Sequence, residues 1–323
     1  MINGELTKPF DAAKGLRQGD PISPFLFAIA IEYLSRLLKG LKHVQEYKFH
    51  PRCGKLNITH LSFADDLLMF ARGDSKSVTN LHTCFMKFSA TSGLLANPNK
   101  SAIYFGGVDQ NTRQEILQNT GYSFGELPFK YLGIPLDTKK LSAMQWQPLI
   151  DRIVAKISSW TAKKLSYAGR VQLVQSMIFG IQSYWSQIFI LPAKVIKLIE
   201  SYCRSYIWPG SNTITKRTLI ACDRMCLPKS AGGYNLMNIR IWNRAAITSV
   251  YWDLTQKKDK MWIKWIHTYY IKGQRLMEMN IPQQASWMVR KIMEAREVAQ
   301  QGPTFLNRKS NTKQIYFHSG KLQ

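Results

Sequence analysis

The chain has 323 residues and a strong excess of basic side chains, 44 Lys and Arg against 20 Asp and Glu, which gives a formal net charge of +24. Its 45% hydrophobic and 12% aromatic content is typical of a globular protein and excludes a disordered basic tail. A surface with this charge repels itself unless an anion binds it, so we expect nucleic acid or an acidic membrane surface as the partner.

The basic excess is concentrated in the second half of the chain. Residues 1–150 carry 17 basic and 12 acidic side chains, a net of +5, whereas residues 151–323 carry 27 and 8, a net of +19. The sequence therefore predicts a nearly balanced first part and a strongly basic second part.

Features of secreted and membrane proteins are missing from the sequence. The first residues lack the basic start and apolar run of a signal peptide. The longest stretch without charge, Val171–Ala193, has 23 residues, but its several Gln and Ser side chains and its helical period favour a buried helix in a soluble protein. Scattered cysteines are typical of a reducing compartment, although Cys222 and Cys226 leave a zinc site open. We expect an intracellular protein, nuclear or cytoplasmic, without a membrane partner.

In chain order, the first part alternates turns, helices and short strands. Residues 15–24 contain two Gly and two Pro and predict a shaped loop, after which Ser23 caps a helix whose first residue is Pro24. The expected elements are this helix over Phe25–Leu38, a β-hairpin over 56–71, a helix over Ser77–Thr91, a strand over Ser101–Phe105 and a second hairpin over 127–136.

From Leu141 onward the hydrophobic period is helical. Apolar side chains recur at helical spacing between Trp146 and Ile157, and two further stripes follow within 171–185 and 195–206. The last twenty or so residues are polar and predict a frayed tail. The expected fold class is α+β, with an antiparallel sheet and flanking helices followed by an all-helical basic part.

The paired carboxylates Asp65 and Asp66 lie at the predicted turn of the first hairpin. Adjacent carboxylates raise each other's pKa, and a bound Mg²⁺ removes that cost. Because successive strand residues point to opposite faces, one ion contacts one of the two directly and needs a further ligand from elsewhere. A solvated acidic turn is the alternative.

Five motifs in this order resemble the reverse transcriptase of LINE-type (non-LTR) retrotransposons, most like the plant elements. Residues 15–24 read Gly-Leu-Arg-Gln-Gly-Asp-Pro-Ile-Ser-Pro, and residues 63–66 read Phe-Ala-Asp-Asp. Similar segments follow at 92–101, at 127–136 and at 164–170 with 226–233. The resemblance spans roughly residues 1–270. It implies a polymerase palm over 1–137, a helical thumb over 138–210, a helical extension over 211–300 and a polar tail over 301–323.

The resemblance implies an RNA-directed DNA polymerase that uses Mg²⁺, an RNA template, a DNA primer and dNTP. Asp65 would bind the metal, Asp66 would support it, and Lys100 would approach the triphosphate. The implied template and nucleotide contacts are Arg17, Gln18 and Gly19, and the implied primer grip is Phe129, Lys130 and Tyr131. We expect backbone contacts from Arg152, Lys156, Lys163, Lys164 and Arg170. Taken alone, Arg17 and Lys100 are ordinary surface cations, and Phe129 and Tyr131 are core aromatics as readily as primer contacts.

The family's second metal-binding aspartate lies on a strand upstream of the Gly-rich loop. Glu5 and Asp11 are the carboxylates in that region, and neither has an apolar strand around it. Because two-metal catalysis needs carboxylates from two strands, we expect the chain to bind Mg²⁺ weakly and to be inactive alone. The alternative is a non-catalytic RNA- or DNA-binding protein derived from a retroelement.

Overall fold

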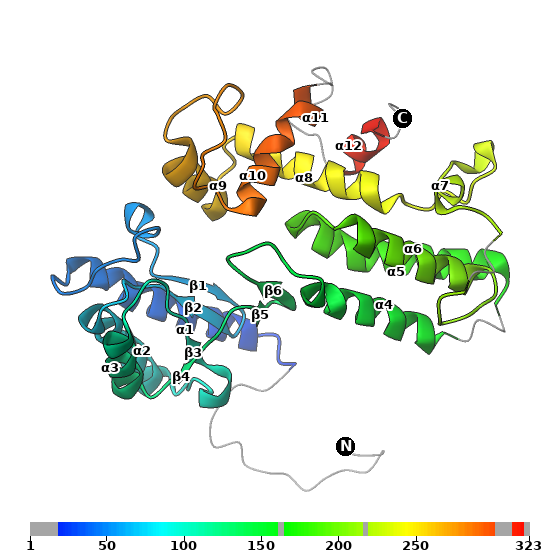
Figure 1. Ribbon diagram of the computed structural model, residues 1–323. Helices are drawn as coiled ribbons and strands as arrows, with labels where there is room; N and C mark the ends of the chain where they lie inside the picture. Colours follow the sequence, from blue (N-terminus) through cyan, green and yellow to red (C-terminus); the bar gives the residue numbers. More distant parts are fainter. Residues whose placement is uncertain (1–18, 161–164, 216–218, 301–311, 320–323) are drawn as a thin grey trace, which may run out of the picture. The chain divides into compact units, whose positions relative to one another are not determined.

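The computed structural model describes residues 19–160, 165–215, 219–300 and 312–319. Within this part the chain is α+β and mostly helical, with three two-stranded sheets (Figure 1). It divides into two compact units, Met1–Glu126 and Leu127–Gln323. The division lies before the hairpin at 127–136, so this hairpin groups with the helical unit, whereas the sequence places a boundary after residue 137.

Two helices and a β-hairpin build the core of the first unit. Leu34 and Leu38 on one helix pack with Phe85 and Phe88 on the other. The elements are α1 (Ser23–Gly40), β1 (His60–Phe63), β2 (Asp66–Met69), α2 (Ser75–Ser92), β3 (Ala102–Ile103), α3 (Gln110–Thr120) and β4 (Ser123–Phe124), with short 3-10 turns at Leu41–His43, Gly54–Leu56 and Pro98–Lys100. The hairpin β1–β2 is antiparallel, as the sequence predicts, whereas β3 and β4 pair in parallel.

The ends of two helices differ from the sequence prediction. Ile22, and not Ser23, is the N-cap of α1, because Ser23 is already the first residue of the helix and Pro24 the second. Helix α3 is absent from the prediction because only Ile116 of it is buried, so it has no apolar stripe. Its caps mark it instead: the side chain of Asp109 accepts from the Thr112 amide, and Gly121 ends it with φ +72°.

The second unit begins with a β-hairpin and continues as helices. Its elements are β5 (Phe129–Tyr131), β6 (Ile134–Leu136), α4 (Gln147–Ser159), α5 (Tyr167–Ile188), α6 (Ala193–Ile207), α7 (Cys222–Met225), α8 (Ile239–Thr255), α9 (Met261–Ile266), α10 (Trp287–Glu294), α11 (Arg296–Gln300) and α12 (Thr312–Ser319), with 3-10 turns at Met144–Trp146 and Lys229–Ala231 and a π-helical turn at His267–Ile271.

The apolar stripe predicted along α4 forms the centre of the helical core. Leu149, Ile153 and Ile157 are at most 2% exposed and pack with buried side chains of α5 and α6. Trp146 and Trp185 lie with their ring centroids 5.7 Å apart in the same cluster. Among the helices that the structure describes, none is long and apolar enough to cross a membrane.

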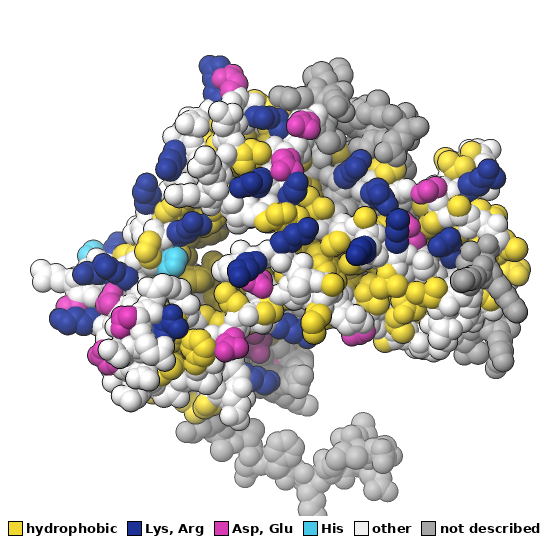
Figure 2. Space-filling model, viewed as in Figure 1, with side chains coloured by type: hydrophobic (Ala, Val, Ile, Leu, Met, Phe, Trp, Pro, Cys, Tyr) yellow, Lys and Arg dark blue, Asp and Glu magenta, His cyan; other side chains and the backbone are white. Residues whose placement is uncertain are grey.

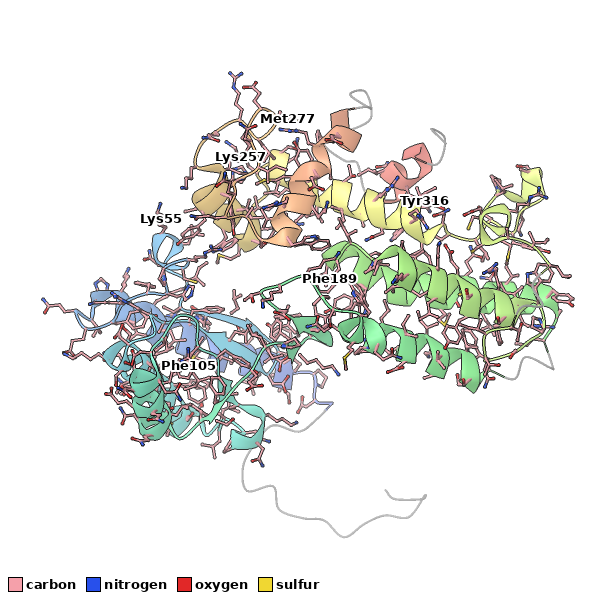
Figure 3. All side chains as sticks on the ribbon, viewed as in Figure 1. Lys55, Phe105, Phe189, Lys257, Met277 and Tyr316 are labelled. Atoms are coloured by element: carbon pink, nitrogen blue, oxygen red, sulfur yellow. The ribbon has the colours of Figure 1, made fainter. Side chains whose placement is uncertain are left out.

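The segment predicted as a polar tail contains α12, which packs on α8. The Tyr316 hydroxyl accepts a hydrogen bond of 3.0 Å from the Asn238 amide, and its ring lies 5.6 Å from that of Trp242 (Figure 3). A buried side chain on α8, Asn243, also fixes the connection between α5 and α6. Its amide accepts from the Leu191 N–H and donates to two carbonyl oxygens at the end of α5.

Candidate active site and nucleic-acid interface

The acidic pair lies at the tip of the β1–β2 hairpin. Phe63 pairs with Asp66 across the hairpin, which leaves Ala64 and Asp65 as its two-residue turn. Ala64 has φ +50°, a left-handed conformation that costs a residue with a Cβ about 1–2 kcal/mol. Both carboxylates are exposed. The turn therefore presents two adjacent acidic side chains to solvent.

The two carboxylates are available to a cation from outside. None of the ion pairs in the described part of the chain involves Asp65 or Asp66. Carboxylate oxygens without an internal cation suit Mg²⁺. Within the described residues, no three or more His, Cys, Asp or Glu side chains are placed to hold a metal ion together. The pair thus has the donor chemistry that Mg²⁺ prefers, and its role as a metal ligand stays a prediction.

The hairpin is anchored beneath this tip to the core of the first unit. Leu67 and Met69 pack against the cluster of α1 and α2. Beyond the strands, the Phe70 amide donates to the Thr59 carbonyl at 2.8 Å, and the Tyr47 hydroxyl donates to the Phe70 carbonyl at 2.9 Å. These contacts fix the base of the hairpin and hence the position of its turn.

His60 ties β1 to α1. Its Nε2 lies 3.0 Å from the Ser35 hydroxyl, and its Nδ1 lies 3.0 Å from the Thr59 hydroxyl. Burial lowers the pKa of His60, and the nearby Lys39 lowers it further. The fold therefore favours the neutral imidazole, which can accept one of these hydrogen bonds and donate the other.

Apolar side chains next to the acidic turn are exposed. Leu61 and Phe63 alternate with His60 along β1 and so lie on its other face, where 61% of Phe63 is accessible. On α1, Phe25 and Ile29 are exposed one helical turn apart. Apolar surface of this kind is typical of a contact area.

The residues predicted to contact the nucleotide are described only in part. Gly19 has φ +87°, which favours glycine there. Lys100 ends the 3-10 turn at Pro98–Lys100 with an exposed side chain. Arg17 and Gln18 lie outside the described residues, as do Glu5 and Asp11.

The predicted primer-grip residues belong to the second unit and divide between two faces of β5. Phe129 pairs with Leu136 and Tyr131 with Ile134, so both aromatics lie on the face that packs toward the helical core, and both are half-buried. Lys130 lies on the other face and is exposed. The primer contact of the two aromatics stays a prediction, and Lys130 is the cation that the strand presents.

The predicted backbone-contacting residues of the thumb also differ from one another. Arg152 and Lys156 are exposed one turn apart on α4, whereas Lys163 and Lys164 lie outside the described residues. The guanidinium of Arg170 faces inward. Its Nη1 donates to the Ile207 carbonyl at 2.9 Å and to the Trp208 carbonyl at 3.0 Å, at the C-terminal end of α6. A nucleic-acid contact by Arg170 stays a prediction.

Further basic side chains lie on helices in which no nucleic-acid contact was predicted for a single residue. Figure 2 shows Lys and Arg gathered along α6 and α8 on the face in view. The exposed cations of these helices are Lys194, Lys197, Arg240 and Arg244. None of them takes part in an ion pair within the described ranges.

Cys222 and Cys226, the alternative zinc ligands, lie beside a small cavity between α6, α7 and α8. A hydrogen bond that the Cys226 thiol donates to Cys222, together with burial, raises the pKa of Cys226. As stated above, the described part of the chain has no cluster that could hold a metal, so the zinc hypothesis gains no support.

Comparison with known families decides what the acidic hairpin belongs to. Residues 1–136 match the family described as reverse transcriptase (RNA-dependent DNA polymerase). This part of the chain is similar to reverse transcriptases. The match includes the Asp65–Asp66 turn and the β5–β6 hairpin, and it confirms the resemblance inferred from the motifs.

Relatives of the reverse transcriptase region come from retroelements and plants. The chain is 25% identical over 246 residues to the 149 kDa protein of transposon TX1 from Xenopus laevis, which covers 74% of the chain and 18% of that protein. It is 33% identical over 102 residues to the Pol polyprotein of the type-1 retrotransposable element R2 from Popillia japonica, covering 32% of the chain and 16% of the polyprotein. The chain is also 25% identical over 141 residues to a protein from Arabidopsis thaliana that is named as a ribonuclease H protein. This similarity covers 44% of the chain and 23% of that protein.

The extent of these similarities has two consequences. The similarity to the TX1 protein is longer than the family match, so it reaches into the helical second unit. The chain spans less than a quarter of the length of each of these three relatives. For the reverse transcriptase family that residues 1–136 match, a divalent metal, nucleic acid and deoxynucleotide substrates are implied.

Proposed function

We propose that the chain is part of the RNA-directed DNA polymerase of a LINE-type retroelement, with the β1–β2 turn as its metal-binding element. The observation that carries this proposal is the pair of exposed carboxylates, outside every ion pair of the described residues, at a fixed hairpin tip inside the family match. In this role Asp65 is the metal ligand and Asp66 supports it. Bound Mg²⁺ supplies charge stabilisation for phosphoryl transfer.

A complete polymerase site needs more carboxylates than the hairpin provides. Two-metal sites hold their ions with carboxylates from more than one element. We propose that the remaining ligand comes from outside the described residues or from another polypeptide, and that the 323-residue chain by itself is inactive or nearly so. Gly19 allows the backbone to approach the nucleotide closely, and Lys100 is the proposed cation for the triphosphate.

The second unit has the proposed task of holding template and primer. Lys130 on the β5–β6 hairpin faces the primer, while Lys156 on α4 contacts backbone phosphates. In this proposal 1–137 act as the palm, 138–210 as the thumb and 211–300 as a helical extension. Template and primer are bound mainly through phosphates, because the unit presents many cations and few acids.

A second candidate function is nucleic-acid binding without catalysis. The net charge of +19 on residues 151–323 and the exposed cations on α6 and α8 favour it. In that case Asp65 and Asp66 have no catalytic task, and the basic helices alone account for function.

Binding and primer extension, measured on the same protein, test the two candidates. We expect the chain to bind an RNA–DNA primer–template duplex with an affinity that falls steeply with salt, and Asp65→Ala to retain this binding. Measurable Mg²⁺-dependent extension that Asp65→Ala abolishes would overturn the proposed inactivity of the chain and exclude the second candidate. Binding that is weak and insensitive to salt would contradict both.

A further inference from the structure

The turn of the β5–β6 hairpin has a backbone conformation that its own sequence disfavours. Leu132 and Gly133 form the two-residue turn, with φ +48° and +80°. Such a turn suits glycine and asparagine at both positions, and a leucine at the first is costly. Contacts from outside the hairpin must therefore help to hold it.

One such contact comes from the far end of α5. The hydroxyl of Tyr184 donates a hydrogen bond of 2.7 Å to the carbonyl of Leu132. The two residues are 52 positions apart in the chain. Tyr184 belongs to an apolar stripe in the sequence and is expected to be buried, but its side chain is partly accessible, at 38%. Its hydroxyl ties the turn to the helix.

A second contact comes from α4. The Nη2 atom of Arg152 lies 3.1 Å from the point where a Cβ on Gly133 would be. The guanidinium thus lies against the bare backbone of the turn, in space that a side chain would occupy. Because glycine has no Cβ, Gly133 permits both the positive φ and the close approach of the guanidinium.

The register of the hairpin sets the face on which its one cation, Lys130, lies. Ile134 is buried in the helical core, and the paired register places Phe129 and Tyr131 on that same face. Lys130 is therefore on the opposite, exposed face. A turn held from α4 and α5 leaves the strand little freedom to rotate this lysine away.

We infer that Tyr184 and Arg152 are positioning residues that lock the hairpin turn and orient Lys130 toward a backbone phosphate of the primer. This inference rests on the proposed primer contact of the hairpin. It assigns Arg152 a task different from the direct phosphate contact expected from sequence, because a positioning guanidinium acts through its planar shape, which lysine lacks.

Binding measurements on the full chain test this inference. The probe is a fluorescein-labelled RNA–DNA primer–template duplex, titrated by anisotropy between about 50 and 200 mM NaCl. We expect Lys130→Ala to weaken binding about 3- to 10-fold and to reduce the salt slope by about one. The matched control Lys87→Ala, an exposed lysine on α2, leaves both unchanged.

Coupling between variants separates positioning from a general structural effect. Tyr184→Phe, which removes one hydroxyl, is expected to weaken binding about 2- to 5-fold in the parent and to have no effect once Lys130 is alanine. It also speeds hydrogen exchange at the Gly133 and Ile134 amides. We expect Arg152→Lys to weaken duplex binding as much as Arg152→Ala does.

Each contrary result has a distinct meaning. If Lys130→Ala leaves the affinity unchanged, the proposed primer contact of the hairpin is wrong, and the inference fails with it. If Lys130→Ala weakens binding but Tyr184→Phe has no effect, or the same effect in both backgrounds, the inference alone is overturned. Full rescue by Arg152→Lys shows that Arg152 contacts phosphate directly.

Discussion

Replacing Arg170 tests whether this residue binds nucleic acid or supports the fold. The sequence predicts a backbone contact, but the guanidinium is turned toward the end of α6. It donates to two carbonyls there at 2.9 and 3.0 Å, makes longer bonds to the carbonyls of Leu165 and Tyr206, and lies 4.8 Å from the ring centre of Tyr167. Arg170→Ala removes all of these contacts at once.

The expected loss follows from these contacts. Hydrogen bonds from a charged donor contribute about 1.5–3 kcal/mol each when buried. Because Arg170 is only partly buried, we discount the two short bonds and expect about 2–3 kcal/mol in total, including a small cation–π contribution. In the variant, the carbonyls at the end of α6 lose these donors and can form hydrogen bonds with water instead.

Urea unfolding followed by tryptophan fluorescence measures this loss. All nine tryptophans of the chain lie in residues 127–323, so the fluorescence reports on the second unit alone. Lys156→Ala is the matched comparison, since that exposed lysine should lower the salt slope of duplex binding and leave stability unchanged. A stable Arg170→Ala variant with a reduced salt slope would refute the structural role.

Two further predictions concern stability. Asn243→Ala removes three hydrogen bonds that hold the α5–α6 connection and should lower the free energy of unfolding of the second unit by about 2–4 kcal/mol, measured by the same fluorescence; a loss below about 1 kcal/mol contradicts it. Because burial lowers the pKa of His60, the folded state disfavours its protonation. Its stabilising contribution is present above the unfolded pKa of about 6.5 and is lost as the pH falls below it. We expect His60→Gln to flatten the acid dependence of hydrogen exchange in α1, and an unchanged dependence would be evidence against this.

Local patterns in the sequence predicted most of the elements. The apolar period of α4 identified its buried face, including Leu149 and Ile153, because a helix that packs on one side repeats every 3.6 residues. The alternation before Asp65 predicted the β1–β2 hairpin in the same way. Helix α3 has no such stripe, and only its capping residues reveal it.

The parts that could not be predicted depend on contacts between residues distant in the sequence. Tyr184 has the spacing of a core residue on α5, and its bond to the Leu132 carbonyl exists only once the hairpin and the helix are brought together. From the sequence alone, Arg170 is likewise indistinguishable from a surface cation. Its hydrogen bonds to the end of α6 exist only in the folded structure. The acidic turn was found because both carboxylates are adjacent in the chain, whereas any further ligand depends on tertiary structure.

The central claim, that the Asp65–Asp66 turn binds a divalent metal, is tested most directly with Mn²⁺ in place of Mg²⁺. Mn²⁺ is paramagnetic and broadens the amide resonances of nearby residues in the isotope-labelled chain. We predict selective broadening at Phe63–Leu67 that Asp65→Asn abolishes and the control Glu115→Gln, an exposed carboxylate on α3, retains. Broadening that is the same in Asp65→Asn, or that is centred away from this hairpin, would contradict the account.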